Sequence, residues 1–246
     1  MPDDNTLFES EIATEIALRG FIALPAEGRS DDVLSWDKAD WADFTDSWRK
    51  LGEDRYMADG GRYRRRRHAA FKLNDHELVR LPAAPHYQSR DYNTLNGGVE
   101  RWFAPVEKNI SDSTVLAEIV TFFKNATALC EQISPASWYL EMHQFRIEPD
   151  ENGQGLPTPE GMHRDGVDWV FVMLIDRQNV SQGETLLAAP DGQEIGRFTL
   201  SNPGDAVFLN DHRVYHGVTP IERIDKLQLG WRDVLVLTLK RDAPQG

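Results

Sequence analysis

The chain has 246 residues, 40% of them hydrophobic, and a formal net charge of −13. Such a chain is long enough to bury a sizeable core, and its negative charge disfavours nonspecific binding to nucleic acid or to an anionic membrane. The single cysteine, Cys130, excludes an intrachain disulfide, and we expect a cytoplasmic protein because the first residues lack the order of a signal peptide and no apolar run reaches membrane-spanning length.

The first half of the chain predicts mainly helices. Phe8, Ile12 and Ile16 recur at four-residue spacing, and residues 30–50 place aromatic side chains among acids at helical spacing. Residues 81–105 are rich in turn formers and aromatics and predict an ordered loop. A broad apolar face then predicts a helix from residue 111 to about residue 133, with Ser or Asp as its N-cap.

A run of arginines, Arg62 and Arg64 to Arg67, interrupts this half. It is weak as a nucleic-acid patch, because the chain around it is acidic and few aromatics are interleaved. The first 60 residues hold fifteen acidic and six basic residues, so we interpret the arginines mainly as ion-pair partners of that acidic segment. One or two of them reaching an anionic substrate is the alternative.

After Pro135 the sequence changes to short apolar segments separated by Gly, Pro, Asn and Asp. Many short strands at regular spacing predict a sandwich or barrel, and eight strands in two sheets form a jelly roll. We therefore expect an α+β protein in which N-terminal helices pack against one sheet of a double-stranded β-helix, a cupin-like core. Residues 1–246 form one domain on this interpretation, with 1–135 as mainly helical support and lid and 136–246 as the jelly-roll core. The expected strands cover residues 138–147, 168–175, 184–190, 196–200, 205–210 and 231–240.

Charged residues directly precede one of these expected strands, in GMHRDGVDWVFV (161–172). Because strand side chains alternate, His163 and Asp165 point to the same side. One carboxylate and two imidazoles bind non-haem Fe(II) and leave coordination positions open for a bidentate cosubstrate and dioxygen. The third ligand is expected in DHRVYHGVTP. We favour His216 over His212, because His212 follows Asn210 and Asp211 in a turn.

A dicarboxylate cosubstrate also needs a cation, and Arg232 opens the last strong strand. Its alternative role is to pair with Asp233, and Arg223 is a rival in a polar loop. In LEMHQFRI (140–147), alternation puts Gln144 and Arg146 on one face. If that face lines the barrel, Gln144 contacts the cosubstrate and Arg146 pairs with an anionic group of the substrate.

Several motifs occur together in the order known from one family. EMHQFRI and PTPEGMHRDG, followed by HGVTPI and RDVLVLTL, resemble the bacterial Fe(II)/2-oxoglutarate dioxygenases related to isoleucine dioxygenase, over roughly residues 85–240. The resemblance implies a double-stranded β-helix with His163, Asp165 and His216 binding iron and Arg232 binding 2-oxoglutarate. It also implies hydroxylation of an aliphatic free amino acid or oxidation of a thioether sulfur. We expect hydroxylation of an aliphatic carbon of a free L-amino acid or an amino-acid derivative.

On this interpretation the cofactors are Fe(II), 2-oxoglutarate and dioxygen, and the partner is a small amino-acid substrate rather than nucleic acid or a membrane. Tyr87, Tyr92 and Trp102, from the 86–103 loop, are expected to cover the substrate. The tryptophans of the front half fit a homodimer interface as well as they fit a core. Two alternatives stay open: a cupin-like metalloenzyme that does not use 2-oxoglutarate, and a non-catalytic jelly-roll binding protein.

Overall fold

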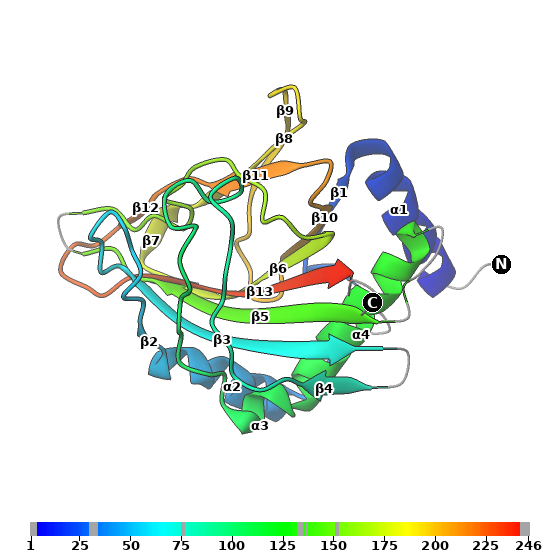
Figure 1. The fold of residues 1–246 in the computed structure, drawn as a ribbon, viewed down its shortest axis with the longest axis horizontal. Helices are drawn as coiled ribbons and strands as arrows, with labels where there is room; N and C mark the ends of the chain where they lie inside the picture. Colours follow the sequence, from blue (N-terminus) through cyan, green and yellow to red (C-terminus); the bar gives the residue numbers. More distant parts are fainter. Residues whose placement is uncertain are drawn as a thin grey trace.

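A computed structural model describes residues 4–29, 34–74, 77–131, 135, 137–150 and 153–241. It is an α+β structure built on antiparallel sheets (Figure 1). The largest sheet has the order β1-β10-β6-β13-β5-β3-β2, with β4 pairing to β3. Its strands are β1 (Phe21–Leu24), β2 (Gly52–Glu53), β3 (Arg64–Leu73), β4 (Leu78–Arg80), β5 (Trp138–Ile147), β6 (Trp169–Gln178), β10 (Ala206–Asn210) and β13 (Trp231–Arg241).

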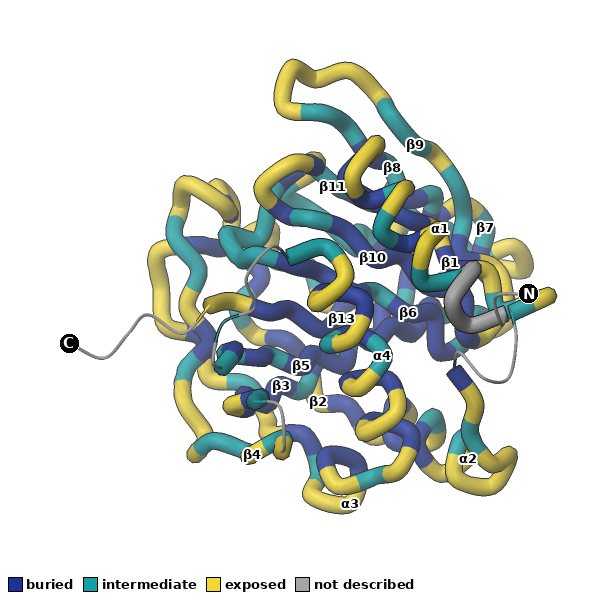
Figure 2. The backbone as a smooth tube through the Cα atoms, turned by 90° about the vertical axis from the view of Figure 1, so that its right-hand side faces the viewer, coloured by how far each residue is buried: buried dark blue, intermediate teal, exposed yellow. Residues whose placement is uncertain are grey.

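Two smaller antiparallel sheets accompany it. One has the order β11-β8-β9, and the other pairs β12 with β7. Their strands are β7 (Val180–Gln182), β8 (Glu184–Ala188), β9 (Glu194–Thr199), β11 (Tyr215–Val218) and β12 (Ile221–Arg223). The β8–β9 hairpin projects from the body of the molecule (Figure 1), and its tip is exposed (Figure 2).

The helices cover one face of the large sheet. They are α1 (Asp4–Arg19), α2 (Lys38–Asp46), the 3-10 helix η1 (Ser47–Lys50), α3 (Lys108–Ser111) and α4 (Thr114–Cys130). Ser113 caps α4 by accepting the N–H of Leu116 at 3.2 Å, so this helix begins after the short α3 rather than at residue 111. Its apolar face joins the main core with Phe44 and Trp48 and the helix-facing side chains of the sheet. None of the described helices is long and apolar enough to cross a membrane.

The central strands β5, β6 and β13 are buried on both faces (Figure 2). Alternate side chains such as Leu140, Met142, Phe171 and Leu237 belong to the core beneath the helices. The side chains between them line a cavity on the other face of the sheet. The large sheet therefore separates an apolar core from a cavity whose wall is partly charged.

The expected strands of the second half are all present, whereas the first half is less helical than predicted. The arginine run forms β3, which pairs with β5 from Arg64↔Ile147 to Leu73↔Trp138. Alternation turns Arg64 and Arg66 toward the cavity. Arg62 and Arg64 contact the preceding acids Glu53 and Asp54, as expected, but the other arginines find different partners.

Candidate functional site

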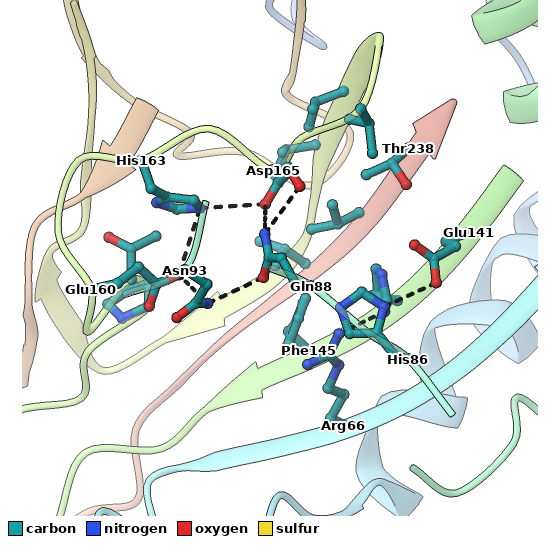
Figure 3. Close-up of a pocket in the computed structure, with 18 of the residues that line it drawn as sticks. Arg66, His86, Gln88, Asn93, Glu141, Phe145, Glu160, His163, Asp165 and Thr238 are labelled. Carbon is teal, nitrogen blue, oxygen red and sulfur yellow. Dashed lines mark hydrogen bonds and ion pairs between the residues drawn. The ribbon is translucent and has the colours of Figure 1, made fainter. Parts of the chain in front are cut away.

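His163, Asp165 and His216 lie together at the cavity. Figure 3 shows His163 and Asp165 side by side. The two histidines face each other across an antiparallel bridge, in which each backbone N–H donates to the other's carbonyl at 2.9 Å. Nε2 of His163 lies 3.4 Å from Oδ1 of Asp165, and Nε2 of His216 lies 3.4 Å from Oδ2. One ligand atom from each residue falls within 4.8 Å of the others, which fits a three-ligand metal site.

Hydrogen bonds orient the donor atoms of this triad. Nδ1 of His163 donates to the carbonyl of Gly161 at 3.0 Å, which leaves Nε2 as the nitrogen that faces Asp165. Asp211 accepts the backbone N–H groups of Asp165, Gly166 and Val167 at 3.0, 2.8 and 3.2 Å. Oδ1 of Asp211 also lies 4.0 Å from Nδ1 of His216. Asp211 therefore holds the turn that carries Asp165 and also lies beside His216.

The charges of the triad favour a bound cation. Burial opposes the anionic form of Asp165, but the contacts with His163 and His216 hold the pKa of its carboxyl well below the usual value. Burial also opposes protonation of His163, and the contacts with Asp165 and Glu160 overcome this and raise its pKa to about 9. The same contacts that favour a proton on His163 also favour a metal ion, because a bound metal cation can take the place of that proton.

Arg232 lines the same cavity from β13 and is 2% exposed. In the described part of the chain its Nε and Nη2 atoms have no hydrogen-bond partner. Burial, together with the charge of Arg177 and against that of Asp233, lowers the pKa of this guanidinium to about 10. A buried guanidinium without a carboxylate partner is suited to bind an anion from the cavity.

Asp233 does not neutralise Arg232, because it points to the other face of β13. There it accepts two hydrogen bonds from Arg146, at 2.7 and 2.6 Å. Gln144 lies on that face as well, and its Nε2 donates to Oγ of Ser47 in η1 at 2.8 Å. The face of β5 that carries Gln144 and Arg146 therefore packs under the helices. This corrects the expectation that it lines the barrel, and neither residue reaches the cavity.

Two of the three expected lid residues also lie outside the cavity wall. Tyr92 packs on Gly166, where a Cβ would stand 2.6 Å from the tyrosine ring, and Trp102 is 58% exposed. Tyr87, the third expected lid residue, does line the cavity. As its place in the sequence indicated, His212 is an exposed turn residue. Its Nε2 lies 3.0 Å from Oδ1 of Asp168. Arg223 donates to the carbonyl of Pro149 at 2.7 Å and is absent from the cavity wall.

Sequence reasoning offered an arginine of the 62–67 run as a substrate contact and Tyr87 as a lid residue, but it missed the other cavity residues between 64 and 101. Gln88 donates to both the carbonyl and Oδ1 of Asp165, at 3.2 and 3.3 Å (Figure 3). Arg66, His86 and Arg101 line the same cavity, whose volume is about 330 Å³. No local sequence motif predicts that these residues line the cavity, because they come from a strand and a loop that meet β5 only in the folded chain.

Comparison with known proteins identifies the family. The profile of the 2OG-Fe dioxygenase family matches residues 45–238, a range that contains the triad and Arg232. This chain belongs to the 2OG-Fe dioxygenase family. It is a dioxygenase that uses Fe(II), 2-oxoglutarate and dioxygen. Membership favours this enzyme class over the cupin-like enzyme without 2-oxoglutarate and over the non-catalytic binding protein.

Individual relatives of this dioxygenase are distant. It is 24% identical to a 3(1)-hydroxy-L-isoleucine 4-dioxygenase from Pantoea ananatis (strain AJ13355), over 94% of this chain and 96% of that protein. It is 26% identical to an L-isoleucine-4-hydroxylase from Bacillus thuringiensis, over 62% of this chain and 64% of that protein. Among solved structures, a bsmA homolog from Methylobium petroleophilum PM1 superposes with a TM-score of 0.85, at 34% identity over 96% of this chain and 95% of the other.

Proposed function

We propose that this dioxygenase hydroxylates an aliphatic carbon of a free L-amino acid or an amino-acid derivative, with release of succinate and carbon dioxide. His163, Asp165 and His216 would hold Fe(II), and Arg232 would bind the distal carboxylate of 2-oxoglutarate. The observation that carries the proposal is the presence of the triad and the unpaired Arg232 guanidinium in one cavity. The names of the two curated relatives support an amino-acid substrate.

The proposal extends to the architecture. We infer that the large sheet and the smaller sheets opposite it form a double-stranded β-helix, with residues 1–246 acting as one dioxygenase domain. The bridge between His163 and His216 supports this inference, because it joins the segment before β6 to β11 of the small sheet. That bridge is also what brings the ligands together from distant parts of the sequence.

When bound, iron and 2-oxoglutarate supply the oxidising chemistry, in which dioxygen oxidises the cosubstrate and one oxygen atom enters the substrate C–H bond. The chain itself binds and orients. Arg232 offers two unpaired nitrogens to an anion, and Asp211 and Gly161 fix the triad through hydrogen bonds. Apolar side chains of β6 and β13, including Val170, Val172 and Val236, line the cavity and exclude water from an aliphatic substrate.

Succinate formation tests the proposal. Purified protein would be given Fe(II), ascorbate, 2-oxoglutarate and a panel of L-valine, L-leucine, L-isoleucine, L-methionine and their N-acetyl derivatives. We expect succinate that depends on one of these compounds and that disappears in His216→Ala. His212→Ala, a change in an exposed histidine of the same segment, is the matched control and should keep the activity. Iron binding without succinate for any compound would contradict the proposed substrate class.

A further inference from the structure

A second group of charged side chains lines the cavity on the side of β3 and β5. The wall contains Arg66, His86 and Glu141, which Figure 3 shows, together with Arg101 and His143. None of them belongs to the metal triad. In the described part of the chain, no hydrogen bond joins any of them to Arg232.

Two of the five are cations that no carboxylate neutralises in the described part of the chain. Arg66 lies between the rings of Phe103 and Phe145, with its guanidinium carbon 3.9 and 4.5 Å from their centroids. Among the described residues, the only side-chain hydrogen bond of Arg66 joins its Nη2 to Nδ1 of His143 at 2.9 Å. The guanidinium carbon of Arg101 lies 6.0 Å from the centroid of the same Phe103 ring. Its Nη2 donates to Oε1 of Gln88 at 3.4 Å.

Both guanidinium groups keep unused donors. Nε of Arg66 and Nε of Arg101 are buried without a partner, and the two residues are 5% and 2% exposed. Burial lowers the pKa values of both guanidinium groups, and the charge of Arg64 lowers them further. Arg64 stands beside them but is already paired with Asp54 at 2.8 Å. The wall thus has two buried cations that would be stabilised by a bound anion.

An anion lies next to these cations. Oε1 of Glu141 contacts Nε2 of His68 and Nδ1 of His86, each at 2.9 Å. Burial opposes its charge, but these two histidines hold the pKa of Glu141 well below the usual value. Its side chain remains 13% exposed at the cavity, and in the described part of the chain no hydrogen bond engages Oε2. His143 connects the two groups, since it touches Arg66 and its ring centroid lies 5.0 Å from that of His86.

A second metal ion is a less suitable ligand for this wall. Ligand atoms of His68, His86, Glu141 and His143 do lie within 4.8 Å of one another. However, the Arg66 guanidinium already contacts His143, and a metal cation beside it would be repelled. Two unpaired guanidinium groups next to one carboxylate are better matched by a molecule that carries both a negative and a positive group.

We propose that Arg66 and Arg101 bind the carboxylate of the substrate and that Glu141 binds its ammonium group, which makes the substrate a free α-amino acid. This rests on the proposed function. Gln88 links Arg101 to Asp165 through hydrogen bonds at 3.4 and 3.3 Å, so the subsite adjoins the metal triad. An N-acyl amino acid lacks the ammonium group and would leave the Glu141 carboxylate without its partner.

Binding measurements test the subsite without relying on turnover. The four free amino acids of the panel would be titrated anaerobically into protein loaded with Fe(II) and 2-oxoglutarate. For the tightest ligand, its carboxamide, its deaminated acid and its N-acetyl form would follow. Since each analogue leaves buried charges unpaired, we expect wild type to bind the free amino acid at least about 100-fold more tightly than each analogue. This comparison needs no variant and so does not depend on whether variants fold.

Variants then assign the charges. Arg66→Met and Arg101→Met should each weaken binding at least about tenfold and reduce the preference for the acid over the carboxamide. Glu141→Gln should reduce the preference for the free amino acid over the deaminated acid. Arg62→Met, a change of an 87% exposed arginine two residues before β3, is the matched control and should bind as wild type does. The affinity for 2-oxoglutarate should be unchanged in all four.

Three results would overturn the subsite: no member of the panel binds, wild type binds the carboxamide or the N-acetyl form as tightly as the free amino acid, or the arginine variants keep the wild-type preferences. Failure of the proposed function looks different. In that case the amino acid binds with the expected dependence on Arg66, Arg101 and Glu141, and no succinate forms.

Discussion

Asp211 accepts three backbone N–H groups from the turn that carries Asp165 and lies beside His216. Substitution Asp211→Asn removes the negative charge and turns an amide N–H₂ toward donors. We expect the affinity for Fe(II) to fall by about 10- to 100-fold, as is usual when a residue that orients metal ligands is changed. Anaerobic titration with Fe(II) measures this change.

Asp205 provides the control for that experiment. It also accepts three backbone N–H groups, but these belong to Ala26, Ser201 and Asn202, none of which is part of the triad or of the turn that carries Asp165. Asp205→Asn should therefore lower stability to a similar degree and leave the affinity for iron unchanged. Equal losses of affinity in both variants would mean that Asp211 acts on the fold alone.

Arg146 and Asp233 form a buried ion pair on the helix-facing side of the sheet, 10% and 2% exposed at their side chains. Arg146→Met leaves the Asp233 carboxylate buried without compensation. We expect the free energy of unfolding to fall by about 3–5 kcal/mol, measured by urea denaturation. The double variant Arg146→Met/Asp233→Leu should recover most of this loss. If Arg146→Met instead lost amino-acid affinity and kept the stability of wild type, Arg146 would be a substrate-binding residue rather than a structural one.

At the scale of the strand, β5 brings His143 into a wall that disfavours protonated histidine. Burial, assisted by Arg66 and Arg101 and opposed by Glu141, lowers the pKa of His86 to about 4, and the pKa of His143 lies well below its usual value. The unfolded chain binds these protons near pH 6.5. The folded state therefore holds fewer protons between pH 6.5 and 4, and stability should fall as the pH is lowered through this range.

Urea denaturation between pH 7.5 and 4.5 checks this prediction. The contribution of His86 alone is at most about 3 kcal/mol. His86→Asn keeps a donor near the position of Nδ1 and should flatten the pH dependence. His212→Asn changes a histidine whose side chain is 65% exposed, and it should leave the slope as it is in wild type. A slope that His86→Asn does not alter would place the acid sensitivity elsewhere.

Elements differ in how far the sequence predicts them. β5 and β13 were predicted within one residue of their ends, because long apolar segments bounded by turn formers are typical of buried strands. β3 was missed because four consecutive arginines resemble a solvated charge cluster. Only the pairing with β5 reveals that Arg64 and Arg66 alternate into a cavity.

The same contrast holds for the site. The histidines and Asp165 stand in motifs with recognisable spacing, and the structure brings them together. Gln144 was assigned to the wrong face, because β5 is buried on both sides and alternation alone does not say which side holds the cavity. Asp211 was interpreted as part of a turn, and its contacts with residues 165–167 depend on long-range folding.

At the scale of the whole molecule, ligands that bind only the folded state should raise its stability. Iron at about 100 times its dissociation constant would add about 2.7 kcal/mol, and 2-oxoglutarate would add a further increment by pairing with Arg232. Anaerobic thermal unfolding with iron alone, and then with both, measures the two increments. Arg232→Met should keep the first and lose the second. If 2-oxoglutarate stabilises this variant as much as wild type, another group binds its distal carboxylate.

The position of β13 in the large sheet has a consequence for synthesis of the chain. This strand follows every other described strand in the sequence, yet it lies between β6 and β5 and pairs with both. On the ribosome, β5 and β6 emerge first and must wait with open edges until residues 231–241 leave the exit tunnel. Open apolar edges invite pairing with other chains. Slow translation of the last segment should therefore favour aggregation more than an equal pause placed before residue 138.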